Sequence, residues 1–96
     1  ILQGLLDSQK LDALLVSTLT NIRYYTGFTG SNALFLVSAK GSTLFTDPRY
    51  AIQASNEANC HVEIVTGPLL RALTARLKKL KARKIGIEDT KVSYAL

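Results

Sequence analysis

Residues 21–31, NIRYYTGFTGS, carry the side chains in this sequence that are best suited to bind another molecule. Arg23 is a permanent cation that can hold a carboxylate, and Tyr24 and Tyr25 are rings that can line a pocket. Gly27 and Gly30 follow, and glycine allows backbone turns that other residues do not. This combination exceeds what a connecting loop requires, because turns need only small or polar residues.

The sequence offers little for bond-breaking chemistry, which needs a nucleophile beside a base, paired carboxylates or a metal held by several ligands. One Cys and one His are present, adjacent at positions 60 and 61. Neighbouring residues in a strand point to opposite faces, so Cys60 and His61 are poorly placed to act as a dyad. We interpret them as a buried thiol and an exposed imidazole at the start of a strand.

The carboxylates and glycines also give weak signals. The seven acidic residues are scattered, and the one adjacent pair, Glu88 and Asp89, lacks the further ligands of a metal site. Residues 26–31 have neither the GxGxxG spacing nor the GK[ST] ending of a phosphate loop. We therefore predict no catalytic residue, metal site or nucleotide site in this chain.

Basic residues concentrate in one segment. The net charge is +5, and seven of the twelve Lys and Arg residues lie within residues 71–84, which contain no acid. One interpretation is a stand-alone binding module that uses this basic helix to engage an acidic partner or nucleic acid. However, cations near a helix end complement the helix dipole, and no aromatic residues are interleaved for base stacking. We favour a solvated helix face over a nucleic-acid patch.

The pattern of apolar residues predicts alternating helices and strands. Leucines at positions 2, 5 and 6 predict a first helix that ends near Ser8. The predicted strands cover residues 12–17, 33–38, 42–46, 61–65 and 84–88. The turn at residues 40–41 is too short for a crossover, so the strands on either side of it pair antiparallel.

Two further helices complete the predicted domain. Asp47 caps a helix with Pro48 at its first position, and small residues at 51, 54, 55 and 58 form its packing face. Leu70, Leu73, Leu77 and Leu80 predict the inner side of a helix that runs to about residue 81. The fold class is therefore α/β: a single three-layer domain with a mixed, mostly buried sheet and helices on both faces.

Length and composition bound the architecture. At 96 residues the chain is one domain, residues 1–96, and its 47% of hydrophobic residues excludes a disordered chain. No apolar run is long enough to span a membrane, and a single Cys fits a reducing compartment, so we predict a cytoplasmic protein. Because the chain begins without Met and residues 92–96 look like the start of another helix, we expect a longer parent protein.

Several motifs in this order of elements resemble one family. Residues 21–24 (NIRY) with 26–31 (TGFTGS), residues 46–50 (TDPRY) and residues 84–88 (KIGIE) are similar to the N-terminal domain of the creatinase, prolidase and aminopeptidase P family. The similarity covers nearly the whole chain, and Pro48, where relatives often have a small residue, is a mild departure. It implies the creatinase N-terminal domain fold, with its ribonuclease H-like motif.

The resemblance implies the non-catalytic half of a two-domain hydrolase. In that family a C-terminal pita-bread domain supplies two Asp, one His and two Glu that hold two Mn, Co or Zn ions, which activate water against an Xaa-Pro bond. No residue here maps onto those ligands, so we expect the chain alone to be inactive and without a cofactor. Its expected partners are its own catalytic domain, a second copy and the peptide substrate. Residues 30–32 replace a longer creatinase loop, which favours a proline-directed peptidase.

The resemblance also places five residues at the substrate entrance: Arg23, Tyr24, Tyr25, Ser31 and Asn32. In this hypothesis one tyrosine packs inward, while Arg23 and the other ring are displayed where a peptide carboxylate passes. The alternative is that the tyrosines and Phe28 are core aromatics that close the end of the sheet.

The hypothesis includes local structural predictions. Thr20 or Asn21 caps a short helical turn, and Ile22 packs inward. Gly27 and Gly30 let the backbone turn sharply.

Overall fold

A mixed five-stranded sheet lies at the centre of the computed structural model, which describes residues 4, 6–7 and 10–88. The strands are β1 Ala13–Val16, β2 Ala33–Ser38, β3 Gly41–Thr46, β4 His61–Ile64 and β5 Ile85–Glu88. They lie in the order β4-β3-β2-β1-β5, with β2 antiparallel to β1 and β3, and with parallel β1–β5 and β3–β4 pairs. The last residues of β1, β3, β4 and β5 therefore share one end of the sheet, the carboxyl end.

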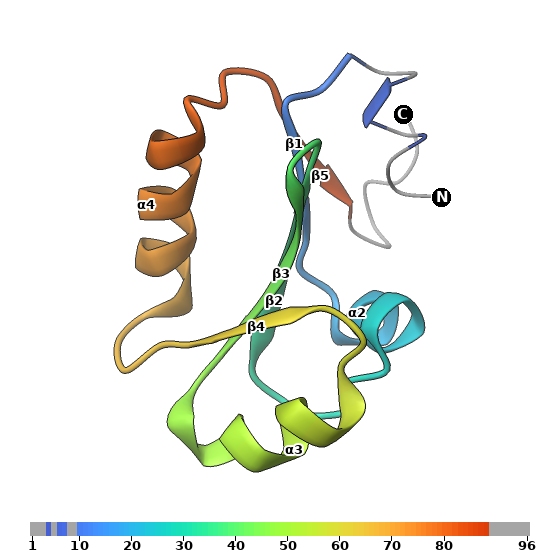
Figure 1. The fold of residues 1–96 in the computed structure, drawn as a ribbon, viewed down its shortest axis with the longest axis vertical. Coiled ribbons are helices and arrows are strands. Elements are labelled where there is room, and N and C mark those ends of the chain that lie inside the picture. The colour runs from blue at the N-terminus through green and yellow to red at the C-terminus, as the bar shows by residue number, and fades with distance from the viewer. Residues whose placement is uncertain (1–3, 5, 8–9, 89–96) are drawn as a thin grey trace.

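Helices cover both faces of the sheet (Figure 1). They are α2 Leu19–Thr26, α3 Ala51–Glu57 and α4 Leu69–Leu80. Ile22 of α2 and Ala54 of α3 pack into a core on one face, and Leu73 of α4 packs against Phe45 on the other. The predicted three-layer α/β fold is confirmed.

The predicted hairpin is also confirmed. β2 has the predicted bounds, whereas β3 begins at Gly41, so the turn occupies residues 39–40. Gly41 has a φ of 134°, which L side chains rarely adopt. β1, β4 and β5 are shorter than predicted.

Asp12 joins the amino ends of β1 and β5. Its Oδ2 accepts hydrogen bonds from the backbone N–H groups of Lys84 (2.9 Å) and Arg83 (2.8 Å). These backbone hydrogen bonds lower the pKa of Asp12, and the bond from Lys84 has the largest effect. They position the parallel pairing in which Ala13 lies opposite Ile85.

Asp47 caps the next helix, as predicted. Its Oδ1 accepts from the backbone N–H of Arg49 at 2.9 Å, and a 3-10 turn, η1 Pro48–Tyr50, leads into α3. Ala54 is fully buried, but Ser55 is exposed, so its predicted place on the packing face is wrong. The reason is that Ser55 is rotated by about 100° from Ala54 around the helix, away from the sheet.

The phase of α4 differs from the prediction by one residue. Leu73 is buried and Leu77 and Leu80 pack beside it, but Leu70 is 61% exposed. Leu69 takes its place, because a residue four positions before Leu73 lies on the same helix face. Within the basic segment 71–84, Arg76 is turned inward and binds Glu63, while Arg71 and Lys78 are exposed.

Cys60 and His61 lie on opposite faces, as predicted. Cys60 is half-buried against the α2 and α3 side of the core, and burial raises the pKa of its thiol. His61 is exposed and lines a cavity below α4. The strand geometry therefore separates the two side chains.

The first predicted helix is described only in part. Gly4, Leu6 and Asp7 are helical and Leu6 is buried, whereas Leu2, Leu5 and the predicted end near Ser8 lie outside the described residues. No helix in the described ranges is long and apolar enough to cross a membrane.

Candidate functional site

The loop before β2 and the turn after β3 meet at the carboxyl end of the sheet. Ala33, the first residue of β2, pairs with Thr46, the last residue of β3. Residues 27–32 and 47–50 are therefore neighbours, although the hairpin separates them in sequence. Polar contacts join the two segments to each other and to α3. We call the residues that make them the carboxyl-end cluster: Thr29, Ser31, Asn32, Asp47, Arg49, Tyr50 and Glu57.

The end of α2 aims the loop into this cluster. The predicted caps Thr20 and Asn21 are wrong, since both lie inside the helix, which begins after Thr18. At the other end the Thr26 hydroxyl donates to the Ile22 carbonyl (2.7 Å) and accepts from the Phe28 N–H (3.0 Å). These bonds fix the first residues of the loop against the helix.

Gly27 and Gly30 serve the loop in different ways. Gly27 has the predicted turning role, with a φ of 85°, and a Cβ there would approach the Glu57 carbonyl oxygen to 2.7 Å. Gly30 is not among the positive-φ glycines of the described residues, so its backbone does not require the conformational freedom of glycine. Instead it leaves space, because a Cβ there would overlap the Phe28 ring, which meets Tyr50 edge to face at 5.7 Å.

Asp47 is the centre of the cluster. Its carboxylate accepts from Arg49 Nε (3.0 Å) and Nη2 (2.8 Å) and from Asn32 Nδ2 (2.6 Å). Hydrogen bonds from the Arg49 side chain, and secondly from the Asn32 amide, hold the pKa of Asp47 well below its usual range. The Asp47 carboxylate in turn raises the pKa of Arg49. The Arg49 guanidinium also lies 5.2 Å from the centroid of the Tyr50 ring. The cluster thus holds an exposed cation in one orientation.

Two further contacts fix the rest of the loop. Ser31 Oγ and the Tyr50 hydroxyl lie 2.6 Å apart, and this hydrogen bond lowers the pKa of Tyr50. Glu57 accepts from the Thr29 backbone N–H (2.8 Å) and hydroxyl (2.9 Å), which lowers the pKa of Glu57. The loop is therefore bonded to both η1 and α3.

The five predicted entrance residues divide into two groups. Ser31 and Asn32 lie in the carboxyl-end cluster. Arg23 and Tyr24 are exposed on α2, with Tyr24 75% exposed, and Tyr25 packs against the core with its ring 5.1 Å from that of Tyr24. The inward tyrosine is thus Tyr25, and the core interpretation holds for Phe28, which is 1% exposed.

Sequence reasoning missed Arg49 and Tyr50 as members of the site. The signal was present in residues 46–50, TDPRY, which we interpret from the sequence only as a helix cap and a family motif. An Asp two residues before an Arg, across a proline with fixed φ, favours the observed pairing. Chemically the cluster offers a fixed cation, an aromatic ring and hydroxyls, which suit recognition of a ligand. Within the described residues, no three His, Cys, Asp or Glu side chains are grouped to hold a metal ion.

Comparisons with known proteins agree on one family. A family model described as the creatinase/prolidase N-terminal domain matches residues 1–96. The uncharacterized peptidase YqhT of Bacillus subtilis is 30% identical over 95 residues, which are 97% of this chain and 27% of that protein.

Solved structures are similar over the same region. An Xaa-Pro dipeptidase from Bacillus anthracis is 28% identical with a TM-score of 0.85, over 98% of this chain and 27% of that one. The N-terminal domain of the cytoplasmic peptidase PepQ from Mycobacterium tuberculosis is 35% identical with a TM-score of 0.84, over 97% of this chain and 72% of that one. The chain thus spans about a quarter of the two longer relatives.

Proposed function

We propose that this chain, which belongs to the creatinase/prolidase N-terminal domain family, is the non-catalytic N-terminal domain of an Xaa-Pro dipeptidase or aminopeptidase. The observation that carries the proposal is the match to 27% of an Xaa-Pro dipeptidase chain at a TM-score of 0.85. The active site then belongs to a separate C-terminal domain, which holds two divalent Mn, Co or Zn ions. The parent protein is a cytoplasmic homodimer that acts on peptides.

Within that enzyme, the carboxyl-end cluster and the exposed side of α2 form part of the wall of the substrate entrance. Arg23 and Tyr24 supply an exposed cation and ring, and Tyr25 supports Tyr24 from the core side. Ser31 and Asn32 belong to a loop that is bonded at several points. The fixed loop supports this role, because prearranged groups lose less entropy when they bind a ligand.

The entrance role is tested in the full-length enzyme with Arg23→Ala. We expect KM for an Xaa-Pro dipeptide to rise about tenfold, because a charge-assisted contact to the substrate carboxylate is lost. The expected kcat and metal content are unchanged. Arg71→Ala is the matched control, since Arg71 is an exposed cation on α4, on the other face of the sheet. Unchanged KM in Arg23→Ala would remove Arg23 from the entrance.

A second experiment tests the non-catalytic assignment. The isolated 96-residue chain and its full-length parent are incubated with Mn²⁺ and an Xaa-Pro dipeptide. We expect hydrolysis only by the parent. Turnover by the chain alone, or a parent gene that stops soon after position 96, would overturn the assignment.

A further inference from the structure

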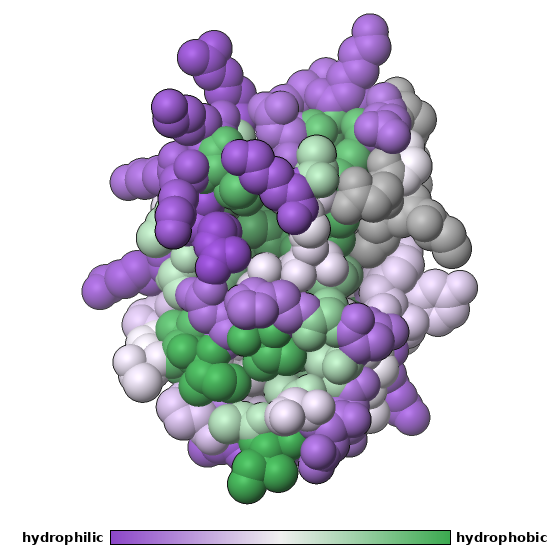
Figure 2. Space-filling view, in the orientation of Figure 1, coloured by the Kyte–Doolittle hydropathy of each residue, from purple (hydrophilic) through white to green (hydrophobic). Residues whose placement is uncertain are grey.

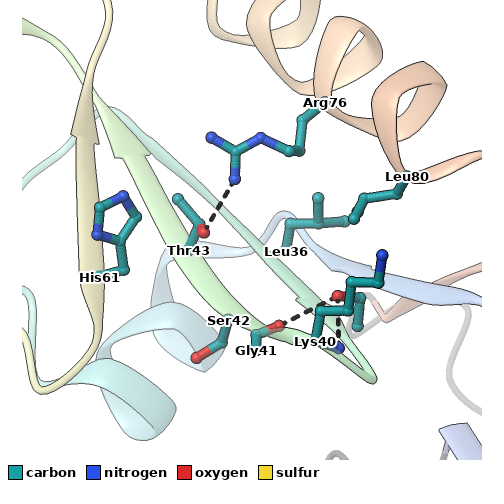
Figure 3. A pocket seen from close by; sticks show the side chains of 9 residues that line it. Leu36, Lys40, Gly41, Ser42, Thr43, His61, Arg76 and Leu80 are labelled. Carbon is teal, nitrogen blue, oxygen red and sulfur yellow. Dashed lines mark hydrogen bonds between the residues drawn. The ribbon is translucent and has the colours of Figure 1, made fainter.

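We propose that a cavity between the β2–β3 turn and α4 binds the phosphate group of a small molecule. Figure 3 shows this cavity, which has a volume of about 360 Å³, within the usual range of small-molecule sites. Lys40 from the turn, His61 from β4 and Arg76 from α4 lie around it, and none of the acidic residues that the structure describes lines it. The proposal does not depend on a peptidase function.

One residue of β3, Thr43, is a neighbour of both His61 and Arg76. Thr43 of β3 lies opposite His61 of the parallel strand β4, so their side chains are neighbours on the α4 face. Ser38 Oγ accepts from the Lys40 N–H (3.2 Å) and donates to the Gly41 carbonyl (3.3 Å), which fixes the turn that carries Lys40. Residues from three elements thus surround one opening.

Arg76 is held in place before any ligand binds. Its Nη2 donates to Glu63, its Nη1 donates to the Thr43 hydroxyl at 3.4 Å, and its guanidinium lies 5.7 Å from the centroid of the Phe45 ring. An arginine has five N–H donors, so three are left for an anion. Glu63 offsets the charge of Arg76, so Lys40 gives the lining of the cavity a net positive charge that attracts an anion.

The walls of the cavity indicate the size and kind of ligand. Buried Leu36 and half-buried Leu80 add apolar side chains to its lining. A phosphate on a small organic group fits this lining: the oxygens meet the basic donors, and the organic part meets the leucines. Figure 2 shows hydrophilic side chains over α4 and around the same end of the sheet.

The test is an NMR titration of the full 96-residue chain with inorganic phosphate at constant ionic strength and pH. We expect saturable shifts of the amides of residues 40–43 and 61. Lys40→Ala and His61→Ala each weaken binding about tenfold, because each removes a charge-assisted contact. Both side chains are exposed, so neither variant threatens the fold.

Lys78→Ala is the matched control, because Lys78 is an exposed cation on the opposite side of α4 and does not line the cavity. It should leave binding within about twofold. The proposal would be overturned if Lys78→Ala lost as much phosphate affinity as Lys40→Ala. It would also be overturned if the amide shifts did not saturate and occurred near every lysine. A parallel titration with phenyl phosphate distinguishes two possible ligands. If phenyl phosphate binds more tightly than inorganic phosphate, the ligand is a phosphate monoester. If the two bind equally, the ligand is free phosphate.

Discussion

Arg49 and Asp47 form a two-point contact at the carboxyl end of the sheet, with Nε to Oδ1 at 3.0 Å and Nη2 to Oδ2 at 2.8 Å. The same carboxylate accepts from Asn32, which lies 15 positions earlier in the chain. One side chain thus caps a helix, orients a cation and joins the two segments beside the hairpin.

The carboxyl-end cluster should make stability depend on acid pH. The pKa of Asp47 is lower in the folded protein than its ordinary value of 3.8. Its stabilising effect is therefore complete above about pH 4 and is lost as the pH falls through the lowered pKa, because protonation then favours the unfolded chain. Urea unfolding should be measured from pH 7 to pH 2. As the pH falls, the free energy of unfolding should decrease less in Asp47→Asn than in the unsubstituted chain. Equal slopes would contradict this.

Gly27→Ala should be clearly destabilising. The substitution combines a φ of 85° with a Cβ that meets the Glu57 carbonyl at 2.7 Å. We expect a loss of about 1–3 kcal/mol in the free energy of unfolding, measured by urea denaturation. Gly67→Ala is the matched control, because nothing lies within 4 Å of its added Cβ and no positive φ is involved. A loss of similar size in Gly67→Ala would remove this explanation.

Two leucines of α4 test which side of the helix faces the sheet. Leu73 is 2% exposed and Leu70 is 61% exposed. Leu73→Ala should lower the free energy of unfolding by about 2–5 kcal/mol, because it leaves a cavity in the core. Leu70→Ala should change it by less than about 0.5 kcal/mol. Thermal unfolding of both variants checks this. Equal losses of stability in Leu73→Ala and Leu70→Ala would contradict the observed packing.

Tyr24 and Tyr25 separate recognition from stability. Tyr24→Ala should leave the free energy of unfolding within about 0.5 kcal/mol, since the ring is exposed. Tyr25→Ala should lower it by about 1–3 kcal/mol, since the ring packs against the core. If the proposed entrance role is right, Tyr24→Ala in the full-length enzyme raises KM without loss of folded protein. Destabilisation by Tyr24→Ala would place its ring in the core.

Features that depend on neighbouring residues could be predicted from the sequence. The short turn forced β2 and β3 into a hairpin, and Asp47 followed by Pro48 marked a helix start. The family resemblance rested on motifs of this local kind and is confirmed by the match over residues 1–96.

Features that depend on distant residues could not be predicted in this way. The need for glycine at position 30 comes from the Phe28 and Tyr50 rings, and Tyr50 lies across the hairpin. The inward place of Leu69 rather than Leu70 depends on how α4 sits on the sheet, because both leucines fit a helical period. Arg76 faces inward only because Glu63 and Thr43 come from β4 and β3.

The position of β5 as the last of the five strands in the sequence determines when one side of β1 becomes paired during synthesis. Asp12 binds the backbone of Lys84, 72 positions later, and β5 then pairs with β1. Until residues 85–88 have been synthesised, β1 has a free row of backbone donors and acceptors on one side. An open strand of this kind pairs readily with another chain. β5 therefore covers this side of β1 only after the other four strands have been synthesised.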